Sequence, residues 1–105
     1  MSQFDVYENN NDATRRAYPY LLNIQSEVLS ALNTLIVLPL APEAGLKAKD
    51  MERLTPKVEY QGETLIVMTP QVAAVPRKNL SEPVGSLAHL RTEIVRALDF
   101  AVGGV

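Results

Sequence analysis

The chain has 105 residues, 47% of them hydrophobic, with a formal net charge of −2 and no cysteine. This length predicts a single domain over residues 1–105, and the lack of cysteine excludes disulfides and thiolate metal sites. The mildly acidic charge argues against general nucleic-acid binding. No apolar run reaches the ~18 residues of a membrane span, and the first residues carry no signal-peptide pattern. These features are compatible with the cytoplasm but do not establish it.

The N-terminal part of the chain predicts two short strands joined by a polar loop. Residues 4–7 alternate apolar and polar side chains, which is typical of a half-buried strand. Residues 8–14 contain three consecutive asparagines and predict a surface loop. Residues 18–24 predict the second strand, which starts at Pro19 or runs along a sheet edge, because proline has no N–H to donate.

The middle of the chain is dominated by its most apolar run, residues 34–40. Its length and β-branched content predict a strand buried on both faces, with Pro39 near its end or at a bulge. The preceding residues 25–33 predict an irregular turn. The following residues 41–55 mix proline, glycine and lysine, and predict a long connection with one helical turn.

The next part of the chain carries a hairpin signal. Residues 57–60 and 63–68 flank the dipeptide Gln61-Gly62, in which glycine can take a positive φ at a tight turn. Residues 72–76 predict a short apolar strand, and residues 77–80 predict a last one.

The C-terminal residues 86–105 form the only long segment with helical periodicity. A stripe of apolar side chains at steps of three and four predicts the buried face, with Ser86 as N-cap and a Gly-Gly pair as the stop. This stripe consists of Leu87, Leu90, Ile94, Leu98 and Ala101, widened by Ala97. Phe100 lies off this stripe and therefore either packs on a neighbouring loop or belongs to an interface.

The residues offer little catalytic chemistry. The single histidine, His89, falls on the polar side of the predicted helix, where a surface position is the usual explanation. No cluster of ligands predicts a metal site and no glycine-rich loop predicts a phosphate site. Two local basic pairs, Arg15-Arg16 and Arg77-Lys78, are best explained as solvated charges. The composition therefore indicates a binding protein.

Several short motifs, none of them specific alone, follow one another in a characteristic order along nearly the whole chain. They are Phe4-x-Val6-Tyr7, Asn23-Ile24-Gln25-Ser26-Glu27-Val28-Leu29, Leu35-Ile36-Val37-Leu38-Pro39-Leu40, Pro56-x-Val58, Met68-Thr69, Ala74-Val75-Pro76 and the terminal Gly104-Val105. In order and spacing these motifs resemble the CcdB family of plasmid and chromosomal toxins.

The resemblance implies a mainly β fold with one C-terminal α-helix, an SH3-like small barrel that forms a symmetric homodimer in the bacterial cytoplasm. CcdB-like toxins bind the A subunit of DNA gyrase and trap the gyrase–DNA cleavage complex. A CcdA-like antitoxin neutralises them through a disordered tail that folds on binding. The implied protein is thus a binding inhibitor and not an enzyme, with no cofactor, no metal and no direct sequence-specific contact with nucleic acid.

The resemblance also carries the gyrase-binding surface onto seven positions of this chain. These positions are Val28, Leu29, Asp99, Val102, Gly103, Gly104 and Val105. Gly103 departs from the pattern, because the best-known member has a tryptophan there that stacks on gyrase arginines, and glycine offers no such surface. The antitoxin site is implied to reach the first loop, where Arg15 and Arg16 are the candidates.

Two alternatives stay open. MazF-like toxins share the implied fold but cleave RNA, a reaction for which Arg15, Arg16 or Arg77 would have to stabilise the transition state. The glycine at position 103 instead points to a weakened homologue that acts as an antitoxin decoy or interaction module.

Overall fold

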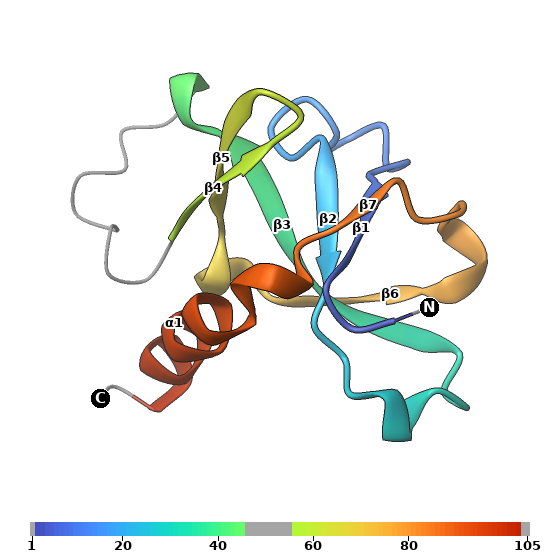
Figure 1. Ribbon diagram of the computed structural model, residues 1–105. Helices are drawn as coiled ribbons and strands as arrows, with labels where there is room; N and C mark the ends of the chain where they lie inside the picture. The colour runs from blue at the N-terminus through green and yellow to red at the C-terminus, as the bar shows by residue number, and fades with distance from the viewer. Residues whose placement is uncertain (1, 46–55, 104–105) are drawn as a thin grey trace.

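A computed structural model describes residues 2–45 and 56–103 of the chain. The described part is a curved seven-stranded sheet with one α-helix, α1 (Arg91–Gly103), lying against it (Figure 1). The strands are β1 (Asp5–Glu8), β2 (Tyr20–Asn23), β3 (Thr34–Pro42), β4 (Lys57–Tyr60), β5 (Glu63–Val67), β6 (Ala73–Pro76) and β7 (Gly85–Ser86).

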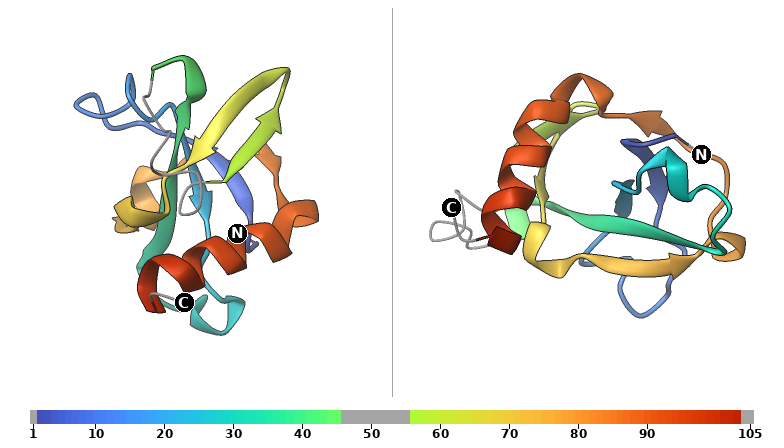
Figure 2. Two further views of the ribbon diagram at one scale, coloured as in Figure 1. Left: turned by 90° about the vertical axis from the view of Figure 1, so that its left-hand side faces the viewer. Right: turned by 90° about the horizontal axis from the view of Figure 1, so that it is seen from below.

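The sheet is organised around β3, the longest strand. The strand order is β4-β5-β3-β2-β1-β7, and β6 pairs with β3 beside this path. One edge of β3 pairs with β2, while its other edge pairs first with β6 and then with β5, all antiparallel. Because β5 and β6 share one edge of the same strand, the sheet bends into a half-barrel, which Figure 2 shows in the view from below.

Alternation along the strands divides the buried side chains between the two faces of the sheet. The inner face forms the main core, to which β1, β2 and β3 contribute Val6, Leu22 and Leu38. The outer face carries a second cluster made of Tyr7, Leu21, Leu35 and Val37, with Val75 and Leu80 at its margin. The prediction that the apolar run is buried on both faces is thus confirmed for residues 37–41 of β3. Ile36, earlier in the strand, is exposed.

The predicted hairpin is confirmed, and its turn shows why the dipeptide matters. β4 and β5 are joined by Gln61 and Gly62, which have φ values of 52° and 79°. Two consecutive positive φ values define the turn that suits the right-handed twist of the flanking strands. A non-glycine residue at the first of these positions is strained, so this turn is formed at some cost to stability.

The helix is confirmed, although it begins later than expected. Leu87 and Ile94 are fully buried in the main core, and Leu90 and Leu98 pack against it. A 3-10 turn, η6 (Ala88–Leu90), precedes α1. The Ser86 hydroxyl accepts from the Ala88 N–H at 3.2 Å, so it contacts the first residue of that turn and is not the N-cap of the α-helix. No helix in the described ranges is long and apolar enough to cross a membrane.

Two further predictions are wrong in detail. Residues 77–80 contain a 3-10 turn, η5 (Arg77–Asn79), in place of a last strand. Pro39 lies inside β3 opposite Leu21, and its carbonyl oxygen accepts from the Met68 N–H at 2.9 Å. Its missing N–H costs nothing there, because the position falls where β3 passes from pairing with β6 to pairing with β5. The two-residue strand β7, before the helix, was not predicted from the sequence.

Candidate functional site

The first predicted contact residues lie on a short 3-10 turn, η1 (Glu27–Leu29), between β2 and β3. The Ser26 hydroxyl accepts from the Val28 N–H at 3.3 Å, which starts the turn. The Val28 side chain is 86% exposed and that of Leu29 is 40% exposed. Two adjacent aliphatic residues at the tip of a turn are thus exposed in the free protein, Val28 almost fully and Leu29 in part, and are available to a partner.

The other predicted contact residues lie at the C-terminal end of α1. Asp99 is exposed, and Val102 is 78% exposed. The helix extends through Gly103, so this glycine is helical and not the first residue beyond the stop. Gly104 and Val105 lie outside the described residues.

The outer face of α1 is not flat next to Asp99. Arg91, Thr92, Val95, Arg96 and Asp99 line an open hollow of about 540 Å³. It combines two guanidinium groups, a carboxylate and an aliphatic side chain. Phe100, by contrast, is half-buried, as is Val95 against the main core.

The two groups of predicted gyrase contacts face the same end of the molecule. Figure 1 shows η1 and the C-terminal end of α1 both at the lower end, on opposite sides of it. On the side of η1 that faces the start of α1, Val28 lines an open hollow together with Ala88 and Arg91. The fold therefore brings η1 and the C-terminal end of α1, the two elements that carry the predicted contacts, to one end of the subunit.

The arginines predicted for antitoxin binding lie in the loop between β1 and β2. Both Arg15 and Arg16 are exposed, and the Arg15 guanidinium pairs with the Asp12 carboxylate at 3.3 Å. Such an exposed pair contributes little to stability. The loop is ordered by Asn9, whose amide donates to Thr14 Oγ1 and to the Tyr18 carbonyl oxygen.

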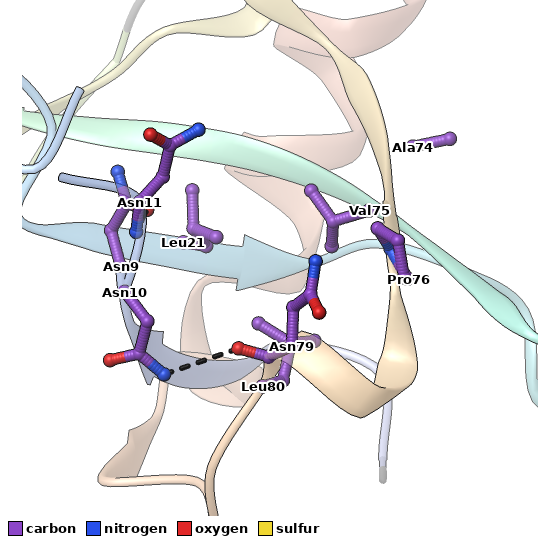
Figure 3. A pocket seen from close by; sticks show the side chains of 9 residues that line it. All are labelled: Asn9, Asn10, Asn11, Leu21, Ala74, Val75, Pro76, Asn79 and Leu80. Carbon is purple, nitrogen blue, oxygen red and sulfur yellow. Dashed lines mark hydrogen bonds between the residues drawn. The ribbon is translucent and has the colours of Figure 1, made fainter. Parts of the chain in front are cut away.

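Beside this loop, the outer face of the sheet is hollowed. A cavity of about 490 Å³ has an apolar floor of Leu21, Val75 and Leu80 and a rim of asparagines (Figure 3). Asn10 bridges the rim by donating to the Asn79 carbonyl oxygen at 3.2 Å. A second cavity of about 240 Å³ shares part of this lining. Among the described residues, no side chain that lines either cavity is charged.

One buried polar group lies in the outer-face cluster. The Tyr7 side chain is fully buried, and its hydroxyl has no hydrogen-bond partner among the described residues. Burial raises the pKa of the Tyr7 phenol above its ordinary value, and the negative charge of Asp5 adds to the rise. The hydroxyl is thus held in its neutral form in an apolar environment.

Two residues have a structural link to the predicted contact loop that the sequence analysis did not foresee, although it named Arg77 as a candidate for RNA cleavage. Gln25 is 3% exposed, and its side-chain amide bonds to the backbone on both sides of η1. Arg77, on η5, donates to the Leu32 carbonyl oxygen. No sequence signal distinguishes such a glutamine or arginine, because their partners are backbone groups that every residue carries.

The described ranges contain no group of three or more His, Asp or Glu side chains that could hold a metal ion. His89 is exposed on the first turn before α1, as the helical pattern predicted.

Comparisons with solved structures show that this fold occurs in known toxins. The Mycobacterium tuberculosis toxin MazF-mt6 superposes with a TM-score of 0.70 at 15% identity, covering 97% of each chain. An endoribonuclease in complex with its cognate antitoxin from a mycobacterial species gives a TM-score of 0.77 at 11% identity, covering 98% of this chain and 95% of that one. A further M. tuberculosis toxin gives 0.65 at 17% identity, covering 78% and 90%. At such identities the similarity establishes the fold alone, and it confirms the predicted small β fold with a C-terminal helix.

The sequence itself identifies the family. The family model of the CcdB protein matches residues 3–104, which span nearly the whole chain and include every predicted contact residue except Val105. The chain therefore belongs to the CcdB family and is a toxin of the toxin–antitoxin class.

Proposed function

We propose that this toxin binds the A subunit of DNA gyrase and traps the gyrase–DNA cleavage complex, acting as a poison and not as an enzyme. The observation that carries the proposal is the exposure of Val28 and Leu29 at the tip of η1. These are the positions at which the family resemblance implies an apolar contact with gyrase. The turn that holds them has no buried side chain of its own, so their exposure has no explanation in the fold.

Burial of these side chains on gyrase is large enough to matter. Fully burying a valine or leucine side chain contributes roughly 1.5–3 kcal/mol. The binding free energy from burying Val28, Leu29 and Val102 would be several kcal/mol per subunit. This gain would offset part of the free-energy cost of association. Gly103 adds no side chain to this surface, and Asp99 offers a carboxylate for a gyrase arginine.

The proposal includes a homodimer in the cytoplasm. A symmetric dimer would place two copies of the η1 and α1 contacts around one axis, which suits a target that is itself two-fold symmetric. Sedimentation at micromolar concentration is expected to give twice the monomer mass. A monomer under those conditions would contradict the composite site.

A cognate CcdA-like antitoxin completes the proposal. A structural neighbour is an endoribonuclease solved with its own cognate antitoxin, which supports a partner of this kind for the fold. Arg15 and Arg16 are exposed on the loop between β1 and β2, where they could pair with acidic side chains of a disordered tail.

The decisive experiment is a gyrase assay with the purified protein. We expect it to inhibit supercoiling and to raise the amount of covalent gyrase–DNA cleavage complex. We also expect expression without an antitoxin to arrest growth, and gyrase A variants to resist. Normal supercoiling at high toxin concentration, with intact protein, would refute the proposal.

An endoribonuclease is the second candidate, because structural neighbours of this fold include MazF-mt6 and an endoribonuclease. It would need a cation at the scissile phosphate. Arg15 pairs with Asp12, and Arg77 donates to the Leu32 carbonyl oxygen, so both guanidinium groups have local structural partners. Defined RNA fragments on incubation with the pure protein would favour this candidate over the gyrase poison.

A further inference from the structure

The loop that carries Val28 and Leu29 is not anchored by buried side chains of its own. All residues from 26 to 34 have exposed side chains. No apolar side chain of the loop is buried in the core, so hydrophobic packing does not fix it. Its internal contacts are the hydrogen bonds of one 3-10 turn and its continuation to Leu32. An apolar loop tip without such anchoring would sample many conformations.

Gln25 holds the loop from beneath. Its side-chain Nε2 donates to the Leu29 carbonyl oxygen at 3.1 Å and to the Thr34 carbonyl oxygen at 3.2 Å. Its Oε1 accepts from the Ile36 N–H at 3.1 Å. One buried amide thus ties the end of η1 to the start of β3. The Gln25 N–H is itself fixed by the Asn23 carboxamide at 2.8 Å.

Arg77 holds the other side of the loop. Its Nε donates to the Leu32 carbonyl oxygen at 2.6 Å, and its backbone N–H donates to the Asn33 carbonyl oxygen at 2.9 Å. The first bond joins residues 45 positions apart in the sequence, and the second joins Arg77 to the residue after Leu32, so both are tertiary contacts that the loop cannot replace locally. The first bond is charge-assisted, a class that is stronger than neutral hydrogen bonds.

We propose that Gln25 and Arg77 are positioning residues that hold Val28 and Leu29 in the conformation that binds the toxin's target. The inference rests on the proposed gyrase-binding function. Neither residue needs to touch the target. A loop fixed before binding loses less conformational entropy on association, so the two hydrogen-bonded anchors raise affinity by preorganisation.

The test compares Arg77→Ala with Lys78→Ala in the full-length toxin. Lys78 is the exposed neighbour on the same 3-10 turn, and it controls for the loss of a positive charge. We expect Arg77→Ala to weaken binding to a gyrase A fragment by roughly tenfold, the scale of a hydrogen bond from a charged group. Lys78→Ala should leave the affinity within a factor of about two.

A double-mutant cycle separates positioning from direct contact. In a Val28→Ala, Leu29→Ala background the loop presents no aliphatic tip, so Arg77→Ala should cause no further loss of affinity. An equal, additive loss in both backgrounds would show that Arg77 contacts gyrase directly, and would overturn the inference. An unchanged affinity in the otherwise natural chain would overturn it as well.

Amide hydrogen exchange in the free toxin tests the anchoring of the loop without requiring that the target be gyrase. We expect Arg77→Ala to speed exchange at the Leu29, Ser30 and Leu32 amides severalfold, with the Leu22 amide of β2 unchanged. Gln25→Met should speed exchange at Ile36 in addition. If the natural toxin fails to bind gyrase while this pattern appears, the proposed function fails and the anchoring of the loop stands. Unchanged exchange in both variants refutes the anchoring itself.

Discussion

The Tyr60 hydroxyl donates a hydrogen bond to the Val84 carbonyl oxygen at 2.8 Å, and its ring lies where a Cβ atom on Gly85 would be. A Cβ added at Gly85 would meet Cε1 and Cζ of Tyr60 at 2.6 and 2.8 Å. The contact links the β4–β5 hairpin to β7, the strand that leads into the helix. Glycine at position 85 is therefore required by close approach and not by backbone conformation.

The first prediction is that Gly85→Ala destabilises the protein by about 1–3 kcal/mol, the usual cost of overpacking a filled site. The Tyr60 ring would have to move and its hydrogen bond to Val84 would weaken. Urea denaturation followed by circular dichroism measures the change. Gly85→Ala in a Tyr60→Leu background is the control, since the smaller side chain leaves room for the methyl group. An equal loss in both backgrounds would contradict the steric explanation.

The second prediction concerns the hairpin turn. Gln61 has a φ of 52°, a conformation that asparagine adopts more readily than glutamine. Gln61→Asn is expected to raise the free energy of unfolding by a few tenths of a kcal/mol up to about 1 kcal/mol. Gly62→Ala is expected to lower it by about 1 kcal/mol, because φ is 79° there although the space is open. Chemical denaturation of the two variants should give changes of opposite sign.

The third prediction concerns the buried phenol of Tyr7. Its folded-state pKa is raised above the unfolded value of about 10, so the folded protein favours the protonated form. The resulting stability is fully present below about pH 10 and is lost as the pH rises through the folded pKa. Tyr7→Phe should remove this part of the alkaline sensitivity. At neutral pH it should be neutral or stabilising by about 1 kcal/mol, since the hydroxyl it removes is buried and unpartnered in the described structure.

Tyr60→Phe provides the contrast for this prediction. The Tyr60 hydroxyl is bonded to the Val84 carbonyl oxygen, so its removal should cost about 1 kcal/mol at neutral pH. Unfolding curves at pH 7 and above pH 10 would compare the two variants. If Tyr7→Phe destabilised as much as Tyr60→Phe at pH 7, an undetected partner of the Tyr7 hydroxyl would have to exist.

The fold could be predicted where a pattern had one physical cause. The helical stripe from Leu87 to Leu98 follows from burial on one face, and the hairpin dipeptide follows from the positive φ values that its turn requires. The family resemblance then supplied the arrangement of these elements, which periodicity does not contain.

The wrong predictions share a different cause. Pro39 was expected near the end of a strand or at a bulge because proline has no N–H to donate. In the structure it lies where β3 changes its pairing partner from β6 to β5, so no N–H is needed there. Residues 77–80 were expected to form a strand, yet Arg77 turns back to bond with the loop before β3. Both outcomes depend on contacts between distant segments. The same holds for Gln25, whose role depends on backbone groups at Leu29 and Ile36.

The fourth prediction tests the exposed tip of η1. Val28→Ala should leave the melting temperature unchanged within about 1 °C, because the side chain is 86% exposed in the free protein. It should nevertheless weaken gyrase inhibition by roughly tenfold, since a buried valine loses about 1–2 kcal/mol on truncation. Val84→Ala is the matched control, as another exposed valine outside the predicted surface. Equal inhibition by the two variants would remove Val28 from the binding site.

The fifth prediction concerns the glycine at the end of α1. Gly103 is the last described helical residue, next to the exposed Val102, so an added side chain would extend the predicted surface. Gly103→Trp is expected to strengthen gyrase inhibition and growth arrest by roughly tenfold, as an indole stacked on an arginine can contribute about 1–2 kcal/mol. Gly103→Ala is the control, because it supplies the helix propensity that glycine lacks, worth up to about 1 kcal/mol, without an aromatic ring. Stronger inhibition by Gly103→Trp but not by Gly103→Ala would identify a toxin weakened by the lack of an aromatic side chain at position 103. Equal activity of the natural chain and both variants would show that binding depends on η1 and not on this position.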